Sequence, residues 1–455
     1  MKVNRLIWML SLLSPLEFCA LGGVTNSTIF SFNSTNGATP QAGLVQGTDG
    51  SFYGTTHEGG AKRWGTVFRI TSGGNLTTLV SFDYDNGANP AAGLIQGIDG
   101  WFYGTTFSGG FGCGTVFRLS ATGTFTNLYS FVGGDDGCNP FGGVVQGMDG
   151  SFYGTTLRGG AHTNRFGDSL GTVFRITADG MFNALVSFDD TNGGQPYTGL
   201  TLSTDGSFYG TTFYGGTYNR GTVFRVTTNG TLAALISFDG TNGNLPVSPL
   251  VQGVDGDFYG VTWSGGTVHR GNVFKITLGG TLTSLAAFDG TNGDNPRSGL
   301  LLGTDGNFYG ATYAGGEYGA GAVFRVTPDG RLTRLYSFSG GDGNNPDRAV
   351  LVQGNDGNFY GTTSKGGEYG YGTIFRLSVP LPPVIQAVSH TGSAFRFAWS
   401  AVAGQTYQVQ YRASLTQTNW SDLGSGTTAT NGTLNISDSI TSSPSQRFYQ
   451  VSLLP

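Results

Sequence analysis

The stretch Asp49-Gly50-Ser51-Phe52-Tyr53-Gly54-Thr55-Thr56 decides the fold, because closely similar copies of it follow along the chain. Its tyrosine recurs as Tyr103, Tyr153, Tyr209, Tyr259, Tyr309 and Tyr360, at steps of 50, 50, 56, 50, 50 and 51 residues. A period of about fifty residues is typical of blade-type or solenoid repeats. The repetition predicts the architecture and says much less about activity, since one scaffold can carry many kinds of site.

A single repeat has the pattern of four antiparallel strands. In the first repeat these are Gly43–Gly47, Ser51–Thr56, Gly65–Thr71 and Leu76–Phe82, and an Asp-Gly dipeptide of the kind found in tight hairpins joins the first two. Apolar side chains stand at adjacent positions of these strands, so both faces of each sheet must be buried, as when every sheet lies between two others. We therefore expect an all-β, seven-bladed β-propeller with four-stranded antiparallel blades.

The two ends of the repeat array predict how the ring closes. The seventh repeat stops after a third strand at Ile374–Ser378 and continues into the proline-rich stretch Pro380–Pro383. The segment Thr28–Phe32 near the amino terminus has the fourth-strand pattern seen at Leu79–Phe82. We expect this N-terminal strand to complete the last blade, which removes sheet edges that would otherwise be exposed.

The segments outside the repeats predict two further parts. Residues 1–22 have the basic start, short apolar run and small-residue cleavage site of a signal peptide, so the protein is expected to be secreted or at the cell surface. Residues 23–379 would form the propeller. Residues 380–455 alternate like strands of a small β-sandwich at Phe395–Trp399, Thr406–Tyr411 and Arg447–Val451, and resemble a reduced fibronectin type III module.

The repeated phrase, the Gly-Gly that follows it, and the later Gly-Thr-Val-Phe-Arg and Ser-Phe-Asp segments resemble the GloVer tandem repeat of exported bacterial proteins over about residues 28–379. The resemblance implies export and a repeat scaffold, and in that family the carboxyl end often supplies a surface anchor. This chain shows no recognisable sorting tail. The resemblance brings no catalytic residues with it.

Composition excludes several partners. The net charge of −5 and the lack of a Lys/Arg cluster give no footprint for nucleic acid. The C-terminal region has no apolar run long enough for a transmembrane anchor.

Cys113 and Cys138 are the two cysteines that follow the predicted signal peptide. They lie in a loop of repeat two and in the linker to repeat three, where a disulfide is predicted. We expect a monomer without a cofactor.

Aromatic side chains in the loops between second and third strands form the main binding hypothesis. They are Trp64, Tyr214, Tyr218, Trp263, Tyr313, Tyr318, Tyr369 and Tyr371. Aromatic faces beside polar linkers such as Asp239–Gly243 suit sugar rings, although aromatics also shield glycine-rich loops. The same linkers offer oxygen atoms to calcium, but they lack the spacing of a calcium loop and side-chain turns explain them, so no metal site is predicted.

An enzyme would use groups that are not repeated. Repeat three has an insertion, Ala161–Leu170, which carries His162, Arg165 and Asp168. His269 in repeat five and His57 beside Glu58 in repeat one are also unmatched in the other repeats. These side chains could supply a general base and a cation for lyase or hydrolase chemistry.

Two repeated sets of charges have a simpler explanation. The basic set is Arg69, Arg118, Arg175, Arg225, Lys275, Arg325 and Arg376, and the acidic set is Asp49, Asp99, Asp149, Asp205, Asp255, Asp305 and Asp356. Both sets are expected at the opposite face of the ring from the aromatic loops, where they would pair.

The sequence as a whole predicts a non-catalytic binding or surface-interaction protein, whose partner is a polysaccharide or another surface protein. The alternatives are a polysaccharide lyase or hydrolase-type propeller enzyme and a structural envelope protein.

Overall fold

The computed structural model describes residues 24–379, 383, 385–391, 394–401, 405–414, 417, 419–439 and 447–453. The predicted signal peptide, residues 1–22, lies outside these residues. The chain divides into two compact units. Asn26–Val352 and Phe359–Leu377 form the repeat unit, and the described residues from Ser378 onward belong to the second, together with Gln353–Asn358. In the described part, the structure is all-β apart from one short 3-10 helix, η1 (Gly134–Asp136).

The first repeat forms one antiparallel sheet in the order β2-β3-β4-β5, from β2 (Val45–Gln46), β3 (Phe52–Thr56), β4 (Thr66–Ile70) and β5 (Leu76–Ser81). These strands fall inside the four predicted segments. All five residues of β3 are buried, as expected for a sheet that is covered on both faces. The register of β3 on β4 places Tyr53 opposite Arg69. The register of β4 on β5 shifts by one residue between Val67 and Phe68.

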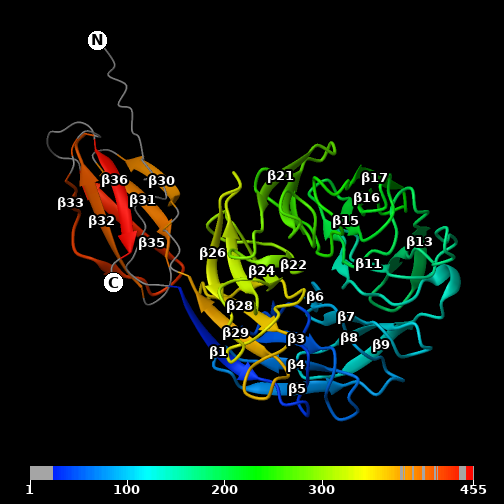
Figure 1. The fold of residues 1–455 in the computed structure, drawn as a ribbon. Helices are drawn as coiled ribbons and strands as arrows, with labels where there is room; N and C mark the ends of the chain where they lie inside the picture. Colours follow the sequence, from blue (N-terminus) through cyan, green and yellow to red (C-terminus); the bar gives the residue numbers. More distant parts are fainter. Residues whose placement is uncertain are drawn as a thin grey trace. The chain divides into compact units, whose positions relative to one another are not determined.

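The next repeats form similar sheets (Figure 1). Repeat two has β6 (Ile95–Gln96), β7 (Phe102–Thr106), β8 (Thr115–Leu119) and β9 (Phe125–Ser130); repeat three has β10 (Val145–Gln146), β11 (Phe152–Thr156), β12 (Thr172–Ile176) and β13 (Phe182–Ser187). Repeat four has β14 (Thr201–Leu202), β15 (Phe208–Thr212), β16 (Thr222–Val226) and β17 (Leu232–Ser237); repeat five has β18 (Val251–Gln252), β19 (Phe258–Thr262), β20 (Asn272–Ile276) and β21 (Leu282–Ala287). Repeat six has β22 (Asp294–Pro296), β23 (Leu301–Leu302), β24 (Phe308–Ala314), β25 (Ala322–Val326) and β26 (Leu332–Ser337).

The seventh repeat shares its sheet with the N-terminal strand. Its strands are β27 (Val352–Gln353), β28 (Phe359–Thr363) and β29 (Thr373–Ser378), and β1 (Thr25–Ser31) is the neighbour of β29 in the order β1-β29-β28-β27 (Figure 1). Directly after β1, the backbone N–H of Phe32 donates to the carbonyl of Gly372 at 3.0 Å. The sequence therefore placed the fourth strand of this sheet correctly.

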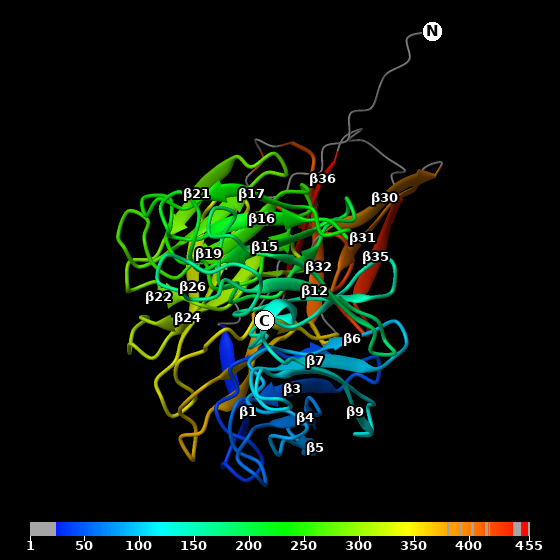
Figure 2. The ribbon, with the colours of Figure 1, turned by 90° about the vertical axis from the view of Figure 1, so that its right-hand side faces the viewer.

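Aromatic stacking joins each sheet to the next. Tyr53 in β3 stacks on Phe102 in β7 with ring centroids 4.0 Å apart, and the two sheets lie side by side in a second view (Figure 2). The same contact recurs as Tyr103–Phe152, Tyr153–Phe208, Tyr209–Phe258, Tyr259–Phe308, Tyr309–Phe359 and Tyr360–Phe52. An aromatic pair of this kind adds roughly 0.5–1.5 kcal/mol beyond the burial of its area. The seventh pair returns from the last repeat to the first.

Threonine hydroxyls form a second set of links between repeats. The Oγ1 of Thr55 donates to the carbonyl of Ala92 at 3.0 Å, and Thr362 in the last repeat donates to Ala42 in the first at 2.9 Å. Thr105, Thr155 and Thr211 make equivalent bonds. In repeats five and six the threonine is replaced by Val261 and Ala311, which have no hydroxyl to donate.

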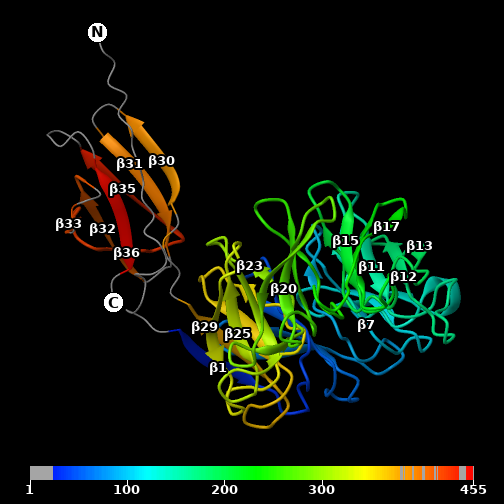
Figure 3. The ribbon, with the colours of Figure 1, turned by 45° about the horizontal axis from the view of Figure 1, so that its top comes forward.

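The second unit contains two small antiparallel sheets (Figure 3). One sheet has β30 (Ile385–Thr391), β31 (Ala394–Ser400) and β35 (Thr433–Ser439); the other has β32 (Thr406–Arg412), β33 (Ser421–Asp422), β34 (Thr427–Thr428) and β36 (Phe448–Leu453). Trp399, Tyr407 and Tyr449 are buried in one aromatic cluster that both sheets share. The buried Asp438 carboxylate accepts from Tyr449 at 2.7 Å and from Arg447 at 2.6 Å, so its charge is compensated.

Candidate functional site

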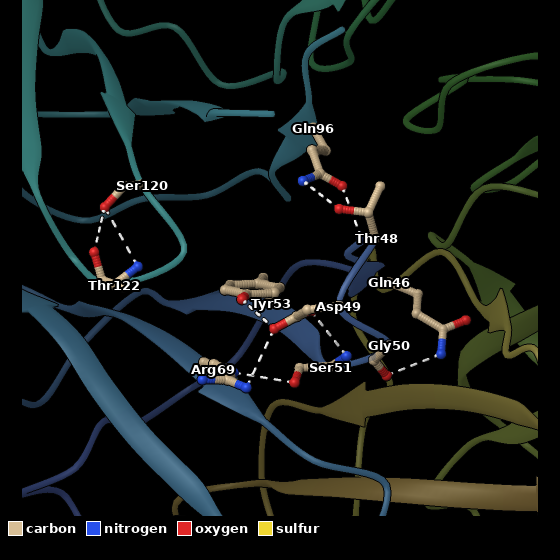
Figure 4. Close-up of polar contacts among 10 residues, drawn as sticks. All are labelled: Gln46, Thr48, Asp49, Gly50, Ser51, Tyr53, Arg69, Gln96, Ser120 and Thr122. Carbon is tan, nitrogen blue, oxygen red and sulfur yellow. Dashed lines mark hydrogen bonds and ion pairs between the residues drawn. The ribbon is translucent and has the colours of Figure 1, made fainter. Parts of the chain in front are cut away.

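The repeat sheets have two ends with different chemistry. At the hairpin end, the Asp49 carboxylate accepts from the Tyr53 hydroxyl at 2.9 Å and lies 3.2 Å from a guanidinium nitrogen of Arg69 (Figure 4). The Tyr–Asp bond recurs at Asp99, Asp149, Asp205, Asp255 and Asp305. Ion pairs of the predicted kind are also present at Arg175–Asp149, Arg225–Asp205 and Lys275–Asp255. Because this arrangement is repeated, it belongs to the fold.

Arg118 departs from that pairing. Its guanidinium lies 4.8 Å from the centroid of the Trp101 ring and donates to the carbonyl of Ala178 at 3.0 Å. Repeat two is the one with tryptophan at this hairpin position, so the stacking partner explains the change.

At the hairpin end, burial and the neighbouring hydrogen bonds and charges change the pKa of Asp49 in opposite directions. Burial raises the pKa of Asp49, but the backbone N–H of Ser51, the Tyr53 hydroxyl and Arg69 together outweigh it, so the pKa lies below its usual value. Burial and the hydrogen bond to Asp49 raise the pKa of Tyr53 to about 12. These groups therefore keep their ordinary charges at neutral pH.

The opposite end of the sheets, which we call the loop end, contains the linkers between repeats. Asparagine side chains of these linkers donate hydrogen bonds to the residues that follow the Thr-Thr pairs or their equivalents. The Nδ2 of Asn89 donates to the carbonyl of His57 at 3.0 Å, and Asn295 and Asn345 hold Trp263 and Tyr313 in the same way. Each of these asparagines precedes a proline and has a positive φ, 54° for Asn89. Asparagine tolerates this left-handed conformation better than most residues.

A cavity of about 310 Å³, here called the inner cavity, is lined by segments just before and within the first strands of the sheets. Its walls include Gly43, Gly93, Gly143, Gly199 and Pro249. Close approach of the backbones requires glycine at several of these positions: a Cβ on Gly43 would lie 2.4 Å from the carbonyl oxygen of Val350. The lining is mainly apolar, and Phe141, Tyr197 and Arg348 are its aromatic and charged members.

Repeat seven has one additional residue in the short segment that carries Arg348. Leu300 is the fourth residue after Pro296, whereas Leu351 is the fifth after Pro346, and this extra position accounts for the 51-residue step. Arg348 has φ 51°, in the left-handed region that arginine rarely adopts. Its guanidinium carbon lies 4.0 Å from the ring centroid of Phe141 and 5.3 Å from that of Tyr197. The insertion therefore places a cation between two aromatic rings at the inner cavity.

A second arginine lies beside the first. The guanidinium carbon of Arg297 is 4.7 Å from the ring centroid of Trp263 and 4.1 Å from that of Tyr313, and a guanidinium nitrogen is 3.6 Å from the Asp347 carboxylate. We call His57, Arg297, Asp347 and Arg348 the charged cluster. Burial lowers the pKa of Arg348, with Asp347 acting to raise it and Arg297 to lower it, and Arg348 stays cationic at neutral pH.

His57 completes the cluster from repeat one. Its side chain is 23% exposed, and its Nδ1 lies 4.0 Å from the Glu58 carboxylate. Burial lowers the pKa of His57; Glu58 and Asp347 act to raise it, and Arg348 lowers it further. The imidazole is therefore neutral at pH 7 and can either donate or accept a hydrogen bond at Nδ1.

The predicted aromatic residues fall into two groups. Trp263 and Tyr313 are partly buried beside Arg297, in the neighbourhood of the charged cluster. The others are exposed and form what we call the outer aromatics: Trp64, Tyr214, Tyr218, Tyr318, Tyr369 and Tyr371. Trp64 packs against Tyr84 at 5.1 Å and Tyr214 against Phe213 at 4.5 Å, so these two also cover neighbouring rings.

The enzyme candidates in repeat three are exposed and part of a local hairpin. Asp168 accepts from the side-chain amide of Asn164 at 3.2 Å, and the guanidinium of Arg165 lies over Phe166. His162 is exposed on the same insertion. His269 is exposed on a different loop with φ 59°, next to Arg270, which pairs with Asp294. The structure gathers no acid–base pair from these residues.

Two other predicted features have local roles. Cys113 and Cys138 are joined by a disulfide, with Cα atoms 4.6 Å apart. In the linker at Asp239, one carboxylate oxygen accepts from the backbone N–H groups of Thr241 and Asn242 at 2.8 and 3.0 Å. Such turns use the carboxylate for the chain itself.

Sequence reasoning missed Phe141, Tyr197, Arg297, Asp347 and Arg348. The first four directly follow the prolines of the linkers, outside the loops between second and third strands from which the candidates were taken. A comparison of the residue after each proline would have found these four, because that position varies from Gln41 to Asp347 while its surroundings repeat. Arg348 is one residue further along the chain.

The sheets and their repeated contacts define a β-propeller-like repeat protein. A model of the Gloeobacter/Verrucomicrobia repeat matches residues 19–201, 163–303 and 297–433. The chain belongs to this repeat family. No helix of the described part has the length and apolar character needed to cross a membrane.

A search of curated proteins gave no match. Among solved structures, a protein from Bacteroides uniformis provisionally assigned as a 6-phosphogluconolactonase is 16% identical, with TM-score 0.45, over 84% of this chain and 98% of its own. Puromycin hydrolase is 12% identical, with TM-score 0.44, over 81% of this chain and 60% of its own. The polysaccharide lyase Uly1 is 10% identical, with TM-score 0.45, over 76% of this chain and 91% of its own. None of these likenesses assigns an activity to this chain.

Proposed function

We propose that the protein is an exported, seven-bladed β-propeller that binds a saccharide at the loop end without altering it. The N-terminal strand closes the ring in this proposal, and the C-terminal unit serves as a fibronectin type III-like spacer. Closure is supported by the stacking of Tyr360 on Phe52 and the bond from Thr362 to Ala42, which repeat between the last and first repeats the contacts made elsewhere. Export is supported by the pattern of residues 1–22.

The observation that carries the binding proposal is the grouping of aromatic rings and fixed charges around the inner cavity. Its volume of about 310 Å³ is near the lower end of the 300–1,000 Å³ typical of ligand pockets. Apolar walls with a few polar groups suit a sugar, whose C–H face stacks on rings while its hydroxyls form hydrogen bonds. A cavity of this size suits one end of a longer saccharide.

A glycan panel, including acidic and neutral polysaccharides, tests this proposal. We expect saturable binding by the wild-type protein and a loss of about tenfold or more in affinity for Tyr197→Ala, whose ring lines the inner cavity, since stacked anchors commonly contribute about 2 kcal/mol or more. Trp64→Ala is the matched control, because Trp64 is an exposed outer aromatic and should retain most of the affinity. Absence of binding to every glycan, or equal losses for both variants, would count against a saccharide site at the inner cavity.

Lyase chemistry is the second candidate function. The observation in its favour is a neutral imidazole, His57, in the same cluster as the cations Arg297 and Arg348. A neutral histidine can accept a proton while a cation offsets developing negative charge. Analysis of bound glycans for new unsaturated or reducing ends distinguishes the two: binding without new ends supports the binding module, and turnover lost in His57→Gln supports the enzyme.

A further inference from the structure

The charged cluster contains polar atoms that the protein itself leaves without hydrogen bonds. Within the described residues, the Nδ1 of His57, the Oδ1 of Asp347 and the Nε of Arg348 are buried and have no hydrogen-bond partner. Buried polar atoms nearly always have partners, because an unmet group has lost its hydrogen bonds to water without replacement. Oδ1 of Asp347 lies 3.6 Å from Arg297 and Nδ1 of His57 lies 4.0 Å from Glu58. Arg348 is therefore the member of the cluster whose unmet atom has no ion-pair partner, which indicates a place for another molecule.

Arg348 differs from the arginines of the hairpin end. Arg225 also has an unpartnered Nε, but its NH2 group lies 3.4 Å from Asp205, so its charge is compensated. Among the described residues Arg348 has no ion pair within 4 Å, and its contacts are the rings of Phe141 and Tyr197. The Asp347 carboxylate pairs with Arg297 instead. The guanidinium of Arg348 is therefore the uncompensated charge of the cluster.

The insertion that creates Arg348 also has a conformational cost. A non-glycine residue in the left-handed region costs of order 1 kcal/mol and persists where surrounding structure holds it. The other six repeats reach the first strand with one residue fewer. An extra, strained residue that carries a partly buried cation is not required by the repeat fold.

We propose that Arg348, at the inner cavity, forms a subsite for the anionic group, carboxylate or sulfate, of an acidic saccharide. This inference rests on the proposed function, and it names the ligand class. The guanidinium supplies charge and N–H donors. The rings of Phe141 and Tyr197 hold the guanidinium plane in place, which reduces the entropy lost when the anion binds.

The first experiment compares D-galacturonate with D-galactose by calorimetry, using the wild-type protein. We expect galacturonate to bind at least about tenfold more tightly, because a hydrogen bond to a charged group contributes roughly 1.5–3 kcal/mol. Arg348→Gln should remove this preference, so that galacturonate and galactose bind with similar affinity, and Arg348→Lys should restore part of it. Arg165→Gln is the matched control, since Arg165 also lies over an aromatic ring but is exposed on the repeat-three insertion. Equal binding of the two sugars by the wild-type protein, or a preference that survives in Arg348→Gln, would overturn the inference.

Histidine NMR provides a test that does not depend on sugar binding. The chain has four histidines, and the spectrum of His57→Gln assigns the signal of His57. Glu58, Asp347 and Arg348 are the charged groups that act on this imidazole, so an anion bound to Arg348 should raise the pKa of His57.

Inorganic sulfate and galacturonate should therefore shift the His57 titration in the wild-type protein and leave it unchanged in Arg348→Gln. A shift with sulfate but no binding of any saccharide would support the anion subsite and reject the proposed function. No shift with either anion would reject the subsite, whatever the neutral glycans do. Circular dichroism of each variant confirms that it is folded, and Arg348→Met replaces Arg348→Gln if the latter is not.

Discussion

The hairpin end and the loop end of the repeats belong to the same sheets, yet their side chains follow opposite rules. At the hairpin end, the aspartate and the tyrosine recur in every repeat. At the loop end, the residue after each Thr-Thr or its equivalent varies, with phenylalanine alone occurring twice: His57, Phe107, Leu157, Phe213, Trp263, Tyr313 and Ser364. A contact made in many copies stabilises each sheet, whereas a single ligand needs groups that are not repeated. The loop end is therefore where this chain departs from its own symmetry, and the charged cluster is one such departure.

Removing β1 should have the largest effect, since β1 is the outer strand of the seventh sheet and its chain continues into the first repeat. A chain that lacks residues 24–32 loses the outer strand of the seventh sheet and the fully buried Phe32. Truncating one buried phenylalanine costs about 3–5 kcal/mol, and the missing strand adds to this loss. We expect the melting temperature, measured by calorimetry, to fall by more than about 10 °C.

Deletion of residues 163–167, in the exposed repeat-three hairpin, is a control that also shortens the chain. It should change the melting temperature by less than about 3 °C. If the chain without residues 24–32 melts like the wild-type protein, the proposal that the N-terminal strand closes the ring is wrong.

Removing the disulfide should have the next largest effect. Cys113 and Cys138 are 25 residues apart, and the chain-entropy model gives about 3.5 kcal/mol for a loop of this length. The double variant Cys113→Ser, Cys138→Ser should therefore unfold at a clearly lower urea concentration than the oxidised wild-type protein. This pair is unrepeated and lies at the loop end, so a large effect would show that some unrepeated residues there serve stability. Identical unfolding midpoints for the two proteins would contradict the expectation.

Most of the fold could be predicted because each repeat gives the same evidence again. The phrase around Tyr53 predicted the second strand of each repeat, and the pattern of Thr28–Phe32 predicted the strand observed as β1 (Thr25–Ser31). The predicted first strand of repeat one, Gly43–Gly47, shortens to Val45–Gln46 because Gly43 packs against the backbone of another repeat. Strand ends depend on such packing, which a local pattern does not contain.

The candidate site could be predicted only in part. Trp263 and Tyr313 were selected as open sugar-binding faces, but Arg297 lies over both rings. That contact forms because the linker turns at Asn295, which has a left-handed backbone conformation. The turn brings the side chain of Arg297 against the loop that contains Trp263. Arg348 was hidden for a different reason: a change from 50 to 51 residues is visible in the sequence, but the inserted residue is identified only when the prolines are aligned.

Replacing Tyr53 by phenylalanine tests the repeated end with a smaller effect. The variant loses one hydrogen bond to Asp49, while Ser51 and Arg69 still contact the carboxylate. We expect the free energy of unfolding to fall by about 1 kcal/mol at pH 7. The pKa of Asp49 is lowered in the folded protein, so its stabilising contribution is present above the unfolded pKa of about 3.9 and is lost as pH falls through the folded pKa.

The difference between Tyr53→Phe and the wild-type protein should accordingly shrink when unfolding is measured at pH 3 and below. Tyr318→Phe is the control, because it removes one exposed hydroxyl and should leave the free energy of unfolding unchanged at pH 7. Phe125→Tyr is not a suitable comparison because that ring packs in the core. A pH-independent loss in Tyr53→Phe would indicate that ring packing, and not the bond to Asp49, is responsible.

The pH dependence of His57 should have the smallest effect on stability and the most direct bearing on the loop end. Burial lowers the pKa of His57, so between its folded pKa and the unfolded value of about 6.5 the unfolded chain binds more protons than the folded one. The folded state is then at its most stable above pH 6.5, and this contribution is lost as pH falls through the window toward the folded pKa. The wild-type melting temperature should decline by about 2 °C or less between pH 7.5 and 5.5 relative to His57→Gln, which has no imidazole to protonate.

Sulfate should reduce this decline. An anion bound beside Arg348 raises the pKa of His57, so the melting temperatures of the two proteins should then differ less with pH. If the two melting curves run parallel across the whole pH range without sulfate, then His57 is not held neutral by its surroundings, and the loop end lacks the electrostatic character that distinguishes it from the hairpin end.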